Sequence, residues 1–354
     1  MKSILVTGGA GFIGSAFVRM LVNTSTVNVV TVDSLTYSGS LLALSSVQSH
    51  PRHVFHQTDI CDEVGLREVF KRHQPMAVVN FAAQTHVDRS IDSPWAFVNT
   101  NLVGTFTLLQ VALDHWRDLA ATSGGAFRFL HVSTDEVFGT LEGSGTFNEM
   151  SPYAPSSPYA ATKAGADHLV RAWTRTYGFP ALITNASNNY GPFQFPEKLI
   201  PLIIEHAISG HELPVYGHGR HVRDWIYVDD HCRALLRVLE RGIVGETYVV
   251  GASNERQNID VVNAICDLVD ELHPDAARRP RRNRIAFVPD RAGHDFRYAL
   301  DASRIRKELG WAPQLTFADG LRQTVQWYLD NQEWCRHMRS RSDEHSRVAN
   351  GPPP

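Results

Sequence analysis

A tyrosine and a lysine, Tyr159 and Lys163, occupy positions i and i+4 of an expected helix over Pro158–Tyr177, so their side chains share one helical face. A free tyrosine, with a pKa of about 10, is a poor base at neutral pH. A neighbouring ammonium group favours the phenolate and lowers that pKa, which makes the tyrosine a candidate base toward an alcohol. Thr134, after an expected strand over Phe127–Ser133, can hydrogen-bond the same alcohol. Because this spacing is common and also suits plain packing, its meaning depends on the surrounding elements.

Two carboxyl groups, those of Asp135 and Glu136, follow Thr134 directly. Elimination of water needs such a pair, because beside a new ketone one carboxyl can remove an acidic C–H proton while the other expels a hydroxyl. Two acids in one site tend to differ in protonation, since like charges oppose joint ionisation. The alternative is that the pair only caps the next turn, where acidic residues are favoured. Neighbouring strand residues point to opposite faces, so the chain must turn after Thr134 for both carboxyls to enter one pocket.

The segment expected to place a cofactor beside these residues lies at the N-terminus. A short apolar strand over Ser3–Thr7 leads into a glycine-rich turn and a helix over Ser15–Leu21. The glycines at positions 8, 11 and 14 allow a tight turn, close approach to a phosphate and close packing of the helix on the strand. The N-terminus of the helix suits a pyrophosphate. The pattern predicts a dinucleotide site, with a glycine turn that binds nothing as the alternative.

An acidic residue indicates which dinucleotide is bound. Asp33 follows a second expected strand over Val27–Val32, and its carboxylate can hold the hydroxyls of the adenosine ribose. The same charge repels a 2′-phosphate, and the next residues, Ser34, Leu35 and Thr36, offer no arginine to receive one. The expected cofactor is therefore NAD rather than NADP.

The first half of the chain alternates strands and helices. Further strands are expected over Val54–Ile60, Ala77–Ala82 and Ala181–Thr184, and further helices over Glu63–His73 and Trp95–His115. Repeated βα units predict an α/β fold with a Rossmann-type doubly wound parallel sheet, whose ligands lie at the carboxyl ends of the strands.

After Gly191 the pattern breaks into shorter, proline- and glycine-rich pieces, which predicts a smaller C-terminal lobe interleaved with the first domain. We expect a cofactor domain over 1–190, completed by 224–253, a lobe made of 191–223 and 254–334, and a frayed polar tail over 335–354. Later elements are expected over Asp229–Arg241 (helix), Glu246–Gly251 (strand) and Ile259–Leu272 (helix). The basic run over 278–284 is interpreted as a solvated loop, with a contact to diphosphate as the alternative.

The composition is that of a soluble globular protein, with 43% hydrophobic and 20% charged residues. A formal net charge of −3 gives no general attraction to nucleic acid or to a membrane surface. No apolar run is expected to approach transmembrane length. The 4 cysteines are scattered, which predicts free thiols in a reducing compartment and no metal site. We expect a cytoplasmic protein that acts on a small molecule.

Taken in order, the motifs resemble one family. The tyrosine–lysine pair after a dinucleotide-binding half is typical of the short-chain dehydrogenase/reductase superfamily in its extended, nucleotide-sugar branch. Within this branch the chain resembles the dTDP-glucose 4,6-dehydratases from Met1 to about Trp334. The matching blocks are TGGAGFIGSAFVR, HVDRSI, STDEVFG, YAPSSPYAATKAGADHLVRAW, NNYGPFQFPEKLIPLI, VRDWIYVDDH and DRAGHDFRYALD.

The resemblance implies a hydro-lyase that oxidises C4 of dTDP-glucose with bound NAD+, eliminates water across C5–C6 and returns the hydride to C6. The product is then dTDP-4-dehydro-6-deoxy-glucose, and NAD+ is regenerated in each cycle. The family also implies a homodimer, which we expect to pair the long helices Trp95–His115 and Pro158–Tyr177.

The resemblance also assigns roles to individual residues. Tyr159 is the implied base for oxidation and Lys163 its modulator, while Thr134 binds the C4 oxygen, Asp135 is the acid toward the C6 hydroxyl and Glu136 the base at C5. The implied NAD contacts are Gly8, Gly11, Phe12, Ile13, Gly14, Asp33, Ser34, Leu35, Thr36, Asp59, Ile60, Ala82, Ala83, Thr100, Tyr159, Lys163 and Asn189. The implied sugar-nucleotide contacts are Thr85, Thr134, Asn188, Lys198, Leu199, Pro214, Tyr216, Arg223, Asn258, Arg291, His294 and Tyr298.

Three alternatives remain open at this point. Gln84 and Thr85 stand where bacterial thymidine-type members usually carry Glu-Ser, and they are more similar to relatives that use UDP-glucose, so a UDP-glucose 4,6-dehydratase is the first alternative. A 4-epimerase or decarboxylase of the same branch is the second, and the pair Asp135 and Glu136 argues against it. A regulator that senses NAD on a former dehydrogenase scaffold is the third, because a fold does not specify function.

Overall fold

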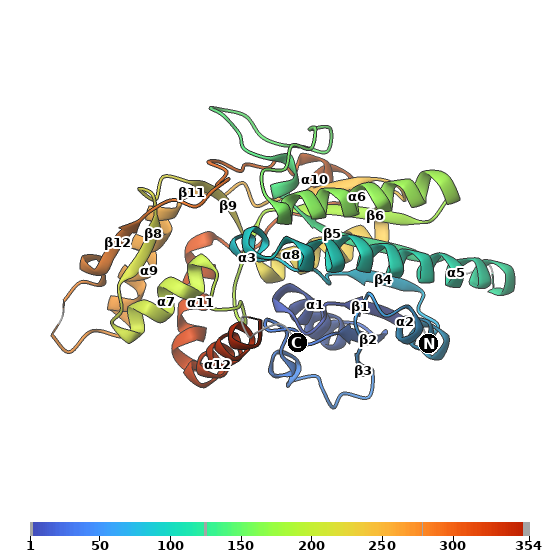
Figure 1. Ribbon diagram of the computed structural model, residues 1–354, viewed down its shortest axis with the longest axis horizontal. Helices are drawn as coiled ribbons and strands as arrows, with labels where there is room; N and C mark the ends of the chain where they lie inside the picture. The colour runs from blue at the N-terminus through green and yellow to red at the C-terminus, as the bar shows by residue number, and fades with distance from the viewer. Residues whose placement is uncertain (1–2, 124–125, 278, 350–354) are drawn as a thin grey trace.

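The computed structural model describes residues 3–123, 126–277 and 279–349. Its centre is a seven-stranded sheet in the order β10-β6-β5-β4-β1-β2-β3, and every neighbouring pair is parallel (Figure 1). The inner strands are apolar and β-branched because both faces of the sheet are covered. The predicted doubly wound sheet is confirmed. Its strands are β1 (Ser3–Thr7), β2 (Asn28–Asp33), β3 (His53–Gln57), β4 (Ala77–Asn80), β5 (Arg128–Thr134), β6 (Ala181–Ala186) and β10 (Thr247–Val250).

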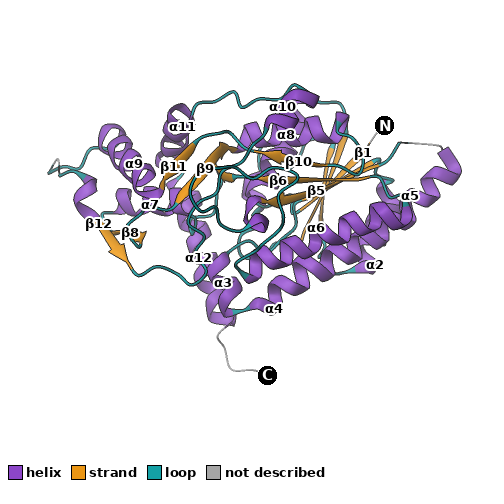
Figure 2. Ribbon diagram, turned by 90° about the horizontal axis from the view of Figure 1, so that it is seen from above, coloured by secondary structure: helices purple, strands orange, loops and turns teal. Residues whose placement is uncertain are grey.

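Helices cover both faces of this sheet (Figure 2). On one face α1 (Phe12–Thr24) packs beside α8 (Val228–Arg241), and both share an apolar cluster with the sheet. On the other face α2 (Glu63–His73), α5 (Thr105–Ser123) and α6 (Pro158–Tyr177) form a second cluster. Strand β1 lies between β2 and β4, so the winding of the chain reverses there. Sheets of this kind bind ligands at the carboxyl ends of the strands around such a point.

A smaller lobe lies at one end of the sheet (Figure 1). Its apolar core is shared by α7 (Leu199–Ser209), α9 (Asn258–Leu272) and α11 (Phe317–Asp330). Strands β11-β9-β7 form one small sheet, and β12 pairs with β8. Their bounds are β7 (Asn188–Tyr190), β8 (Leu213–Tyr216), β9 (Val222–Tyr227), β11 (Glu255–Gln257) and β12 (Ile285–Val288). The chain leaves this lobe for α8 and β10 and then returns to it, so the two parts are interleaved; the predicted domain limits remain predictions.

The long helix expected over Trp95–His115 is divided into three parts. It begins as α4 (Pro94–Phe97), continues as a π-helical segment, η2 (Val98–Gly104), and ends as α5. The π segment turns Asn101 inward, where its side chain accepts a hydrogen bond from the N–H of Gln84 at 2.9 Å and donates to Thr162 Oγ1 at 2.9 Å. Such π segments often occur at functional sites. Here the segment holds the loop after β4 against α6.

The same stretch corrects one expectation about membranes. Residues Pro94–Ala121 are long and apolar enough to cross a membrane by length and composition, although no run of that kind was expected. However, more than half of its most apolar part is buried inside the molecule, where α5 packs against α2 and α6. A core helix that contacts neighbours on two sides is apolar for that reason.

The interpretation of the basic run over 278–284 as a solvated loop is wrong for Arg281. This residue begins a short 3-10 helix, η4 (Arg281–Arg284), and is only 3% exposed. Its guanidinium donates to Asp270 Oδ1 at 2.7 Å and to the carbonyl oxygens of Ala207 and His273 at 3.0 and 2.6 Å. The arginine therefore joins α7, α9 and the start of β12, while Arg278 lies outside the described residues.

Replacing Arg281 by alanine is expected to lower the free energy of unfolding by about 2 to 4 kcal/mol, because buried acceptors lose a charged donor. The matched control is Arg282→Ala. Arg282 makes an ion pair with Asp267 in which both side chains are about half exposed, so its loss is expected to change stability little. Urea unfolding of both variants measures the difference, and equal stability of the two would contradict the buried role.

The expectation of a frayed tail is wrong for residues 335–349. They belong to helix α12 (Gln332–Ala349), and Cys335 and Met338 are fully buried in the core of the smaller lobe. The segment is polar overall, and the few apolar residues that lie at helical spacing along one face were not taken as a helix signal. Residues 350–354 lie outside the described residues.

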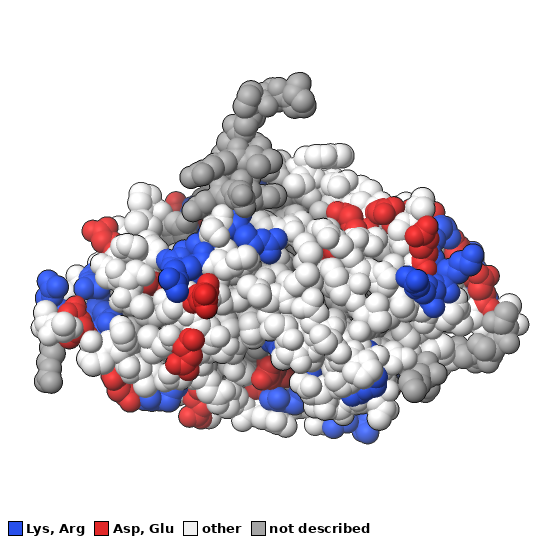
Figure 3. Space-filling model, turned by 90° about the horizontal axis from the view of Figure 1, so that it is seen from below, with Lys and Arg blue, Asp and Glu red and all other residues white. Residues whose placement is uncertain are grey.

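Charged side chains are mixed on the surface. Figure 3 shows one face on which lysine and arginine lie near aspartate and glutamate, mostly around its margin, and its middle carries few charges. A surface of mixed sign fits the formal net charge of −3 and creates no large field of one sign on this face.

Candidate active site

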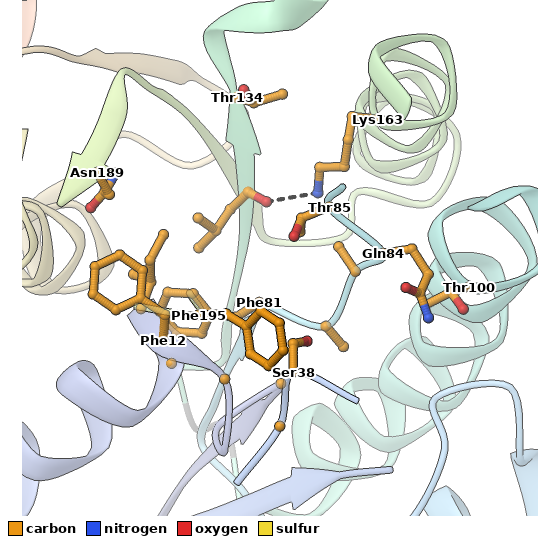
Figure 4. A pocket seen from close by; sticks show the side chains of 18 of the residues that line it. Phe12, Ser38, Phe81, Gln84, Thr85, Thr100, Thr134, Lys163, Asn189 and Phe195 are labelled. Carbon is orange, nitrogen blue, oxygen red and sulfur yellow. Dashed lines mark hydrogen bonds between the residues drawn. The ribbon is translucent and has the colours of Figure 1, made fainter. Parts of the chain in front are cut away.

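One pocket extends along the carboxyl ends of the strands, from the glycine turn after β1 to helix α6 (Figure 4). Gly8 has a φ of 65°, and a Cβ there would lie 2.6 Å from the backbone nitrogen of Ala82. A Cβ on Gly14 would lie 2.2 Å from the carbonyl oxygen of Gly8. Only glycine fits at both positions, so the backbone segments of this turn pack closely together at the wall of the pocket.

The N-terminus of α1 faces the same pocket. Its N-cap is Gly11, which has no side chain to occupy the first N–H groups, and the first turn, which begins with Phe12 and Ile13, contains no acidic residue. The unpaired N–H groups and the positive end of the helix dipole are therefore available to an anion. This geometry fits the pyrophosphate of a dinucleotide.

A fixed carboxylate lies at the end of β2, as the sequence predicts. Asp33 accepts hydrogen bonds from the backbone N–H of Ala10 at 2.9 Å and of Leu35 at 2.8 Å, which hold it beside the glycine turn. Burial raises the pKa of Asp33, and these two backbone bonds together with Arg341 oppose that rise. A phosphate cradle with an oriented carboxylate beside it is the donor set that NAD requires.

The structure brings together almost all residues predicted to contact NAD. Strands β3 and β4 end earlier than expected, because the chain continues as loops that line the pocket. The lining residues from the predicted set are Gly8, Gly11, Phe12, Ile13, Gly14, Asp33, Ser34, Thr36, Asp59, Ile60, Ala82, Ala83, Thr100, Tyr159, Lys163 and Asn189. Leu35 is not among the lining residues.

A sharp turn follows β5. Thr134 ends the strand, and the chain then forms a 3-10 helix, η3 (Asp135–Phe138). Thr134 Oγ1 accepts a hydrogen bond from the N–H of Glu136 at 3.3 Å and donates to Asp135 Oδ1 at 3.2 Å. The side chain that caps the turn is thus Thr134 rather than either carboxyl. The turn places Thr134, Asp135 and Glu136 along the same pocket as Tyr159 and Lys163.

The two neighbouring carboxyl groups lie in different environments. Asp135 is 2% exposed, and its Oδ2 has no hydrogen-bond partner among the residues that the structure describes. Burial, with a further contribution from Glu136, holds the pKa of Asp135 well above its usual range. Burial also raises the pKa of Glu136, but Arg291, Lys198 and Arg223 oppose it. Burial thus raises both pKa values, but that of Asp135 further, so Asp135 is the better proton donor of the pair and Glu136 the better base.

The tyrosine and the lysine lie on the inner side of α6. Lys163 Nζ donates to the carbonyl oxygen of Val132 at 2.9 Å, the bond drawn in Figure 4. Burial lowers the pKa of Lys163 to about 8, so the lysine is a cation at neutral pH. Contrary to expectation, burial raises the pKa of Tyr159, and Glu136 adds to this, although a hydrogen bond with Thr134 lowers it. In this arrangement the lysine alone does not make Tyr159 a ready base.

A buried polar network beneath the lysine was missed by the sequence analysis. Asp167, one helical turn after Lys163, accepts hydrogen bonds from Ser133 Oγ at 3.0 Å and Tyr153 OH at 2.7 Å. Its other oxygen lies 3.4 Å from His131 Nε2. The negative charge of Asp167 raises the pKa of Lys163 against the effect of burial. The i, i+4 spacing of Lys163 and Asp167 was a readable signal for this pair.

Only part of the predicted sugar-nucleotide set lines the pocket. Thr85, Thr134, Asn188 and Lys198 do so, and Lys198 Nζ donates to the carbonyl oxygen of Thr85 at 2.9 Å. The others are not among the lining residues and belong to the smaller lobe or the loops beside it. These are Leu199, Pro214, Tyr216, Arg223, Asn258, Arg291, His294 and Tyr298.

Contacts in the smaller lobe join several of these residues to the pocket. The guanidinium of Arg223 lies 4.5 Å over the ring of Tyr298, and Arg291 lies 3.5 Å from Asp88, which follows the loop after β4. Arg223 and Arg291 also favour the ionised form of Glu136. Arg223 is buried and donates to the carbonyl oxygens of Val222, Phe296 and Asp295, so both arginines act on the pocket through their charge rather than by lining it.

Three side chains of this region form a group that could hold a metal ion: His221, Asp290 and His294. The sequence predicts no metal site. Asp290 forms a hydrogen bond with His294 Nδ1 at 2.6 Å and lies 3.1 Å from His221 Nε2, so its carboxylate already has a close partner on each imidazole. The positive charges of Arg223 and Arg291 lower the pKa of His221 further after burial, and they disfavour an added cation.

Two further pocket residues had no predicted role. Glu197 accepts a hydrogen bond from Tyr37 OH at 2.9 Å and lies 3.4 Å from Arg89. His231 is fully buried, and its Nδ1 lies 2.9 Å from Asn189 Oδ1, so it orients a predicted NAD contact. Their only sequence signal is their position inside the matching blocks.

Known proteins share this chain's sequence and fold. The family model described as GDP-mannose 4,6 dehydratase matches residues 5–324. A dTDP-glucose 4,6-dehydratase of Neisseria meningitidis serogroup B is 54% identical over 354 residues, which is 99% of this chain and 100% of that protein. A crystal structure of the dTDP-glucose 4,6-dehydratase of Streptomyces venezuelae with NAD and TYD bound has a TM-score of 0.87 and 44% identity, covering 95% of this chain and 99% of that one. A UDP-glucose 4-epimerase of Thermotoga maritima has a TM-score of 0.81 and 28% identity, covering 93% and 99%.

The sheet, the glycine turn and the Thr134–Tyr159–Lys163 set define an NAD-dependent enzyme of the extended short-chain dehydrogenase/reductase class. The 54% sequence identity with the Neisseria meningitidis dehydratase, over nearly the full length of both chains, indicates a particular family within this class. The chain belongs to the dTDP-glucose 4,6-dehydratase family.

Proposed function

We propose that the protein is a dTDP-glucose 4,6-dehydratase that converts its substrate to dTDP-4-dehydro-6-deoxy-glucose. The observation that carries this proposal is the turn after β5, which places two carboxyls beside the tyrosine in one pocket, with the pKa of Asp135 raised further than that of Glu136. A 4-epimerase needs no additional acid and base at this place. The two carboxyls also argue against a regulator that only senses NAD, since an acid and a base side by side suit elimination.

The first step assigned to the chain is removal of the C4 hydroxyl proton. Thr134 orients the C4 oxygen, and Tyr159 receives the proton as the phenolate, a form that the Thr134 hydrogen bond and an added positive charge in the pocket favour against burial. The chemistry that NAD supplies when bound is reversible hydride transfer, from C4 and back to C6. Lys163 contributes a fixed positive charge near the tyrosine, and Asp167 keeps that charge in place. Burial excludes water from the phenol, which strengthens these electrostatic effects.

The second step is the loss of water. Glu136 removes the C5 proton that the C4 ketone makes acidic, and Asp135 donates its proton to the C6 hydroxyl, which leaves as water. The separate environments of the two carboxyls support this division, because Glu136 has three cationic neighbours whereas Asp135 is almost fully enclosed. C6 then receives the hydride while Glu136 returns its proton to C5, so the C4 ketone is retained and NAD+ is restored. The proton that Tyr159 took from the C4 hydroxyl balances the one that Asp135 gave to the departing water, and the sugar has lost one water.

The choice of nucleotide follows from the relatives. The Neisseria meningitidis protein is named for dTDP-glucose, and this supports the thymidine substrate. Gln84 and Thr85 still differ from the usual bacterial pair, and both line the pocket. The backbone N–H and carbonyl of Gln84 both form hydrogen bonds with the side chain of Asn101, which anchors this loop. UDP-glucose is therefore the competing substrate to be tested.

We further propose that the enzyme is a cytoplasmic homodimer. Free cysteines suit a reducing compartment. The outer surface of the α4–α5 stretch is apolar, with Trp95 71%, Val103 42% and Phe106 46% exposed, and exposed apolar patches mark interaction sites. Light scattering at micromolar concentration is expected to give twice the mass of the chain, and a monomer would contradict the dimer.

The experiment that tests the function is mass spectrometry of the product after incubation of the purified protein with dTDP-glucose or UDP-glucose, without added NAD. Loss of one water from the thymidine substrate alone is expected. Loss from the uridine substrate instead would assign the specificity to the loop that carries Gln84 and Thr85. An unchanged mass with both substrates, even after addition of NAD, would contradict the proposal.

A further inference from the structure

The last described helix reaches from the smaller lobe to the cofactor domain. Arg341, in α12, donates hydrogen bonds to the carbonyl oxygens of Leu35 at 3.3 Å and Thr36 at 3.1 Å, and also to that of Gly39. One guanidinium thus forms hydrogen bonds with three carbonyl groups of a single loop. Arginine suits this task because its donors are arranged in a rigid, permanently charged plane.

The loop that Arg341 holds forms the wall of the pocket next to Asp33. Ser34, Thr36 and Gly39 line the pocket, whereas Leu35 turns away from it with a φ of 55°. That left-handed backbone is unusual for leucine and needs support from its surroundings. Two bonds provide support on opposite sides: the Leu35 N–H donates to Asp33, and the Leu35 carbonyl accepts from Arg341. The loop residues predicted to contact NAD therefore depend on a side chain outside the pocket.

Helix α12 itself is anchored in the smaller lobe. Trp334, Cys335 and Met338 are buried in that lobe's core, and Arg339 lies 3.1 Å from the buried carboxylate of Glu205 in α7. Figure 1 shows α12 between this lobe and the blue N-terminal part of the cofactor domain. Arg341 consequently links the two parts of the molecule across the edge of the NAD pocket.

We propose that Arg341 is a positioning residue that retains NAD by holding the loop 34–39 in its binding conformation. The inference rests on the NAD site of the proposed function. An enzyme that restores NAD+ within each cycle does not need to release it, so a bond that slows its dissociation costs the cycle nothing. We call these three hydrogen bonds of Arg341 the clamp. Because Arg341 belongs to the lobe assigned to the sugar nucleotide, the clamp couples the position of that lobe to retention of NAD.

The test is the dissociation rate of radiolabelled NAD from the full-length protein into an excess of unlabelled NAD, without any sugar nucleotide. Arg341→Ala is expected to dissociate roughly 10- to 100-fold faster, which corresponds to the loss of a hydrogen bond to a charged group. Arg341→Lys keeps the charge but not the planar set of donors, so its rate is expected to lie between those of the alanine variant and the wild type. Arg336→Ala is the matched control, because Arg336 lies on the same helix, is exposed and bonds only to the Gln332 carbonyl at 3.4 Å.

Thermal unfolding of the NAD-free variants separates retention from plain stability. If Arg341 only stabilises the packing of α12, Arg341→Ala lowers the melting temperature but leaves the dissociation rate of NAD equal to that of Arg336→Ala. This result would contradict the proposal. Faster dissociation with both lysine and alanine variants still folded supports it. If the wild-type protein binds no labelled NAD, the cofactor site of the proposed function fails, and the clamp fails with it.

Discussion

Glu136→Gln is expected to lower the rate of water loss from dTDP-glucose by ~10²–10⁴-fold, the contribution of a positioned general base. The glutamine keeps the size of the side chain and its place in the turn after Thr134 but cannot accept the C5 proton. Product formation is followed by mass spectrometry. Oxidation at C4 does not use Glu136, so the absorbance change of the nicotinamide on addition of substrate is expected to persist.

The pH dependence gives this prediction a second readout. Because burial raises the pKa of Glu136, the wild-type rate is expected to fall as the pH drops through a value above the ordinary glutamate range. Loss of the Lys163 charge, with a pKa of about 8, is expected to reduce the rate on the alkaline side. In Glu136→Gln, the fall of the rate at low pH that is due to protonation of Glu136 is expected to disappear. Glu142→Gln, at an exposed position, is the control for the same change of charge, and an unaltered rate and profile in Glu136→Gln would contradict the role of base.

Tyr159→Phe is expected to reduce turnover by a similar ~10²–10⁴-fold, and here C4 oxidation fails as well. The substitution removes only the hydroxyl, while the ring keeps its edge contact with Phe97 at 6.4 Å between centroids. Folding and the content of NAD are therefore expected to be unchanged. Tyr177→Phe, at the exposed end of the same helix, is the matched control.

The two variants together distinguish the steps. A glutamine variant that oxidises C4 without losing water, beside a phenylalanine variant that does neither, is the expected pattern. Turnover near the wild-type rate in Tyr159→Phe would assign the first proton transfer to another group. In that case the raised pKa of Tyr159 in the NAD-free protein would describe its working state.

Much of the fold follows from local patterns in the sequence. The bounds of the helices Glu63–His73 and Pro158–Tyr177 and of the strand Ser3–Thr7 agree with the predicted ones, because apolar periodicity and caps act over a few neighbouring residues. The glycine turn was readable for the same reason. So was the pairing of Tyr159 with Lys163, since helical spacing alone places them on one face.

The tertiary structure decided what depends on residues far apart in the chain. It decided that the chain turns at Asp135, so that both carboxyls reach one pocket, and that Arg223 and Arg291 from the smaller lobe lower the pKa of Glu136 against the effect of burial. It also decided that Arg281 is buried and that Arg341 reaches the loop after Asp33. Burial and long-range hydrogen bonds set these properties, and no local period records them. The sequence by itself thus determined the residues that carry the chemistry, while packing between the two lobes determined their charge and position.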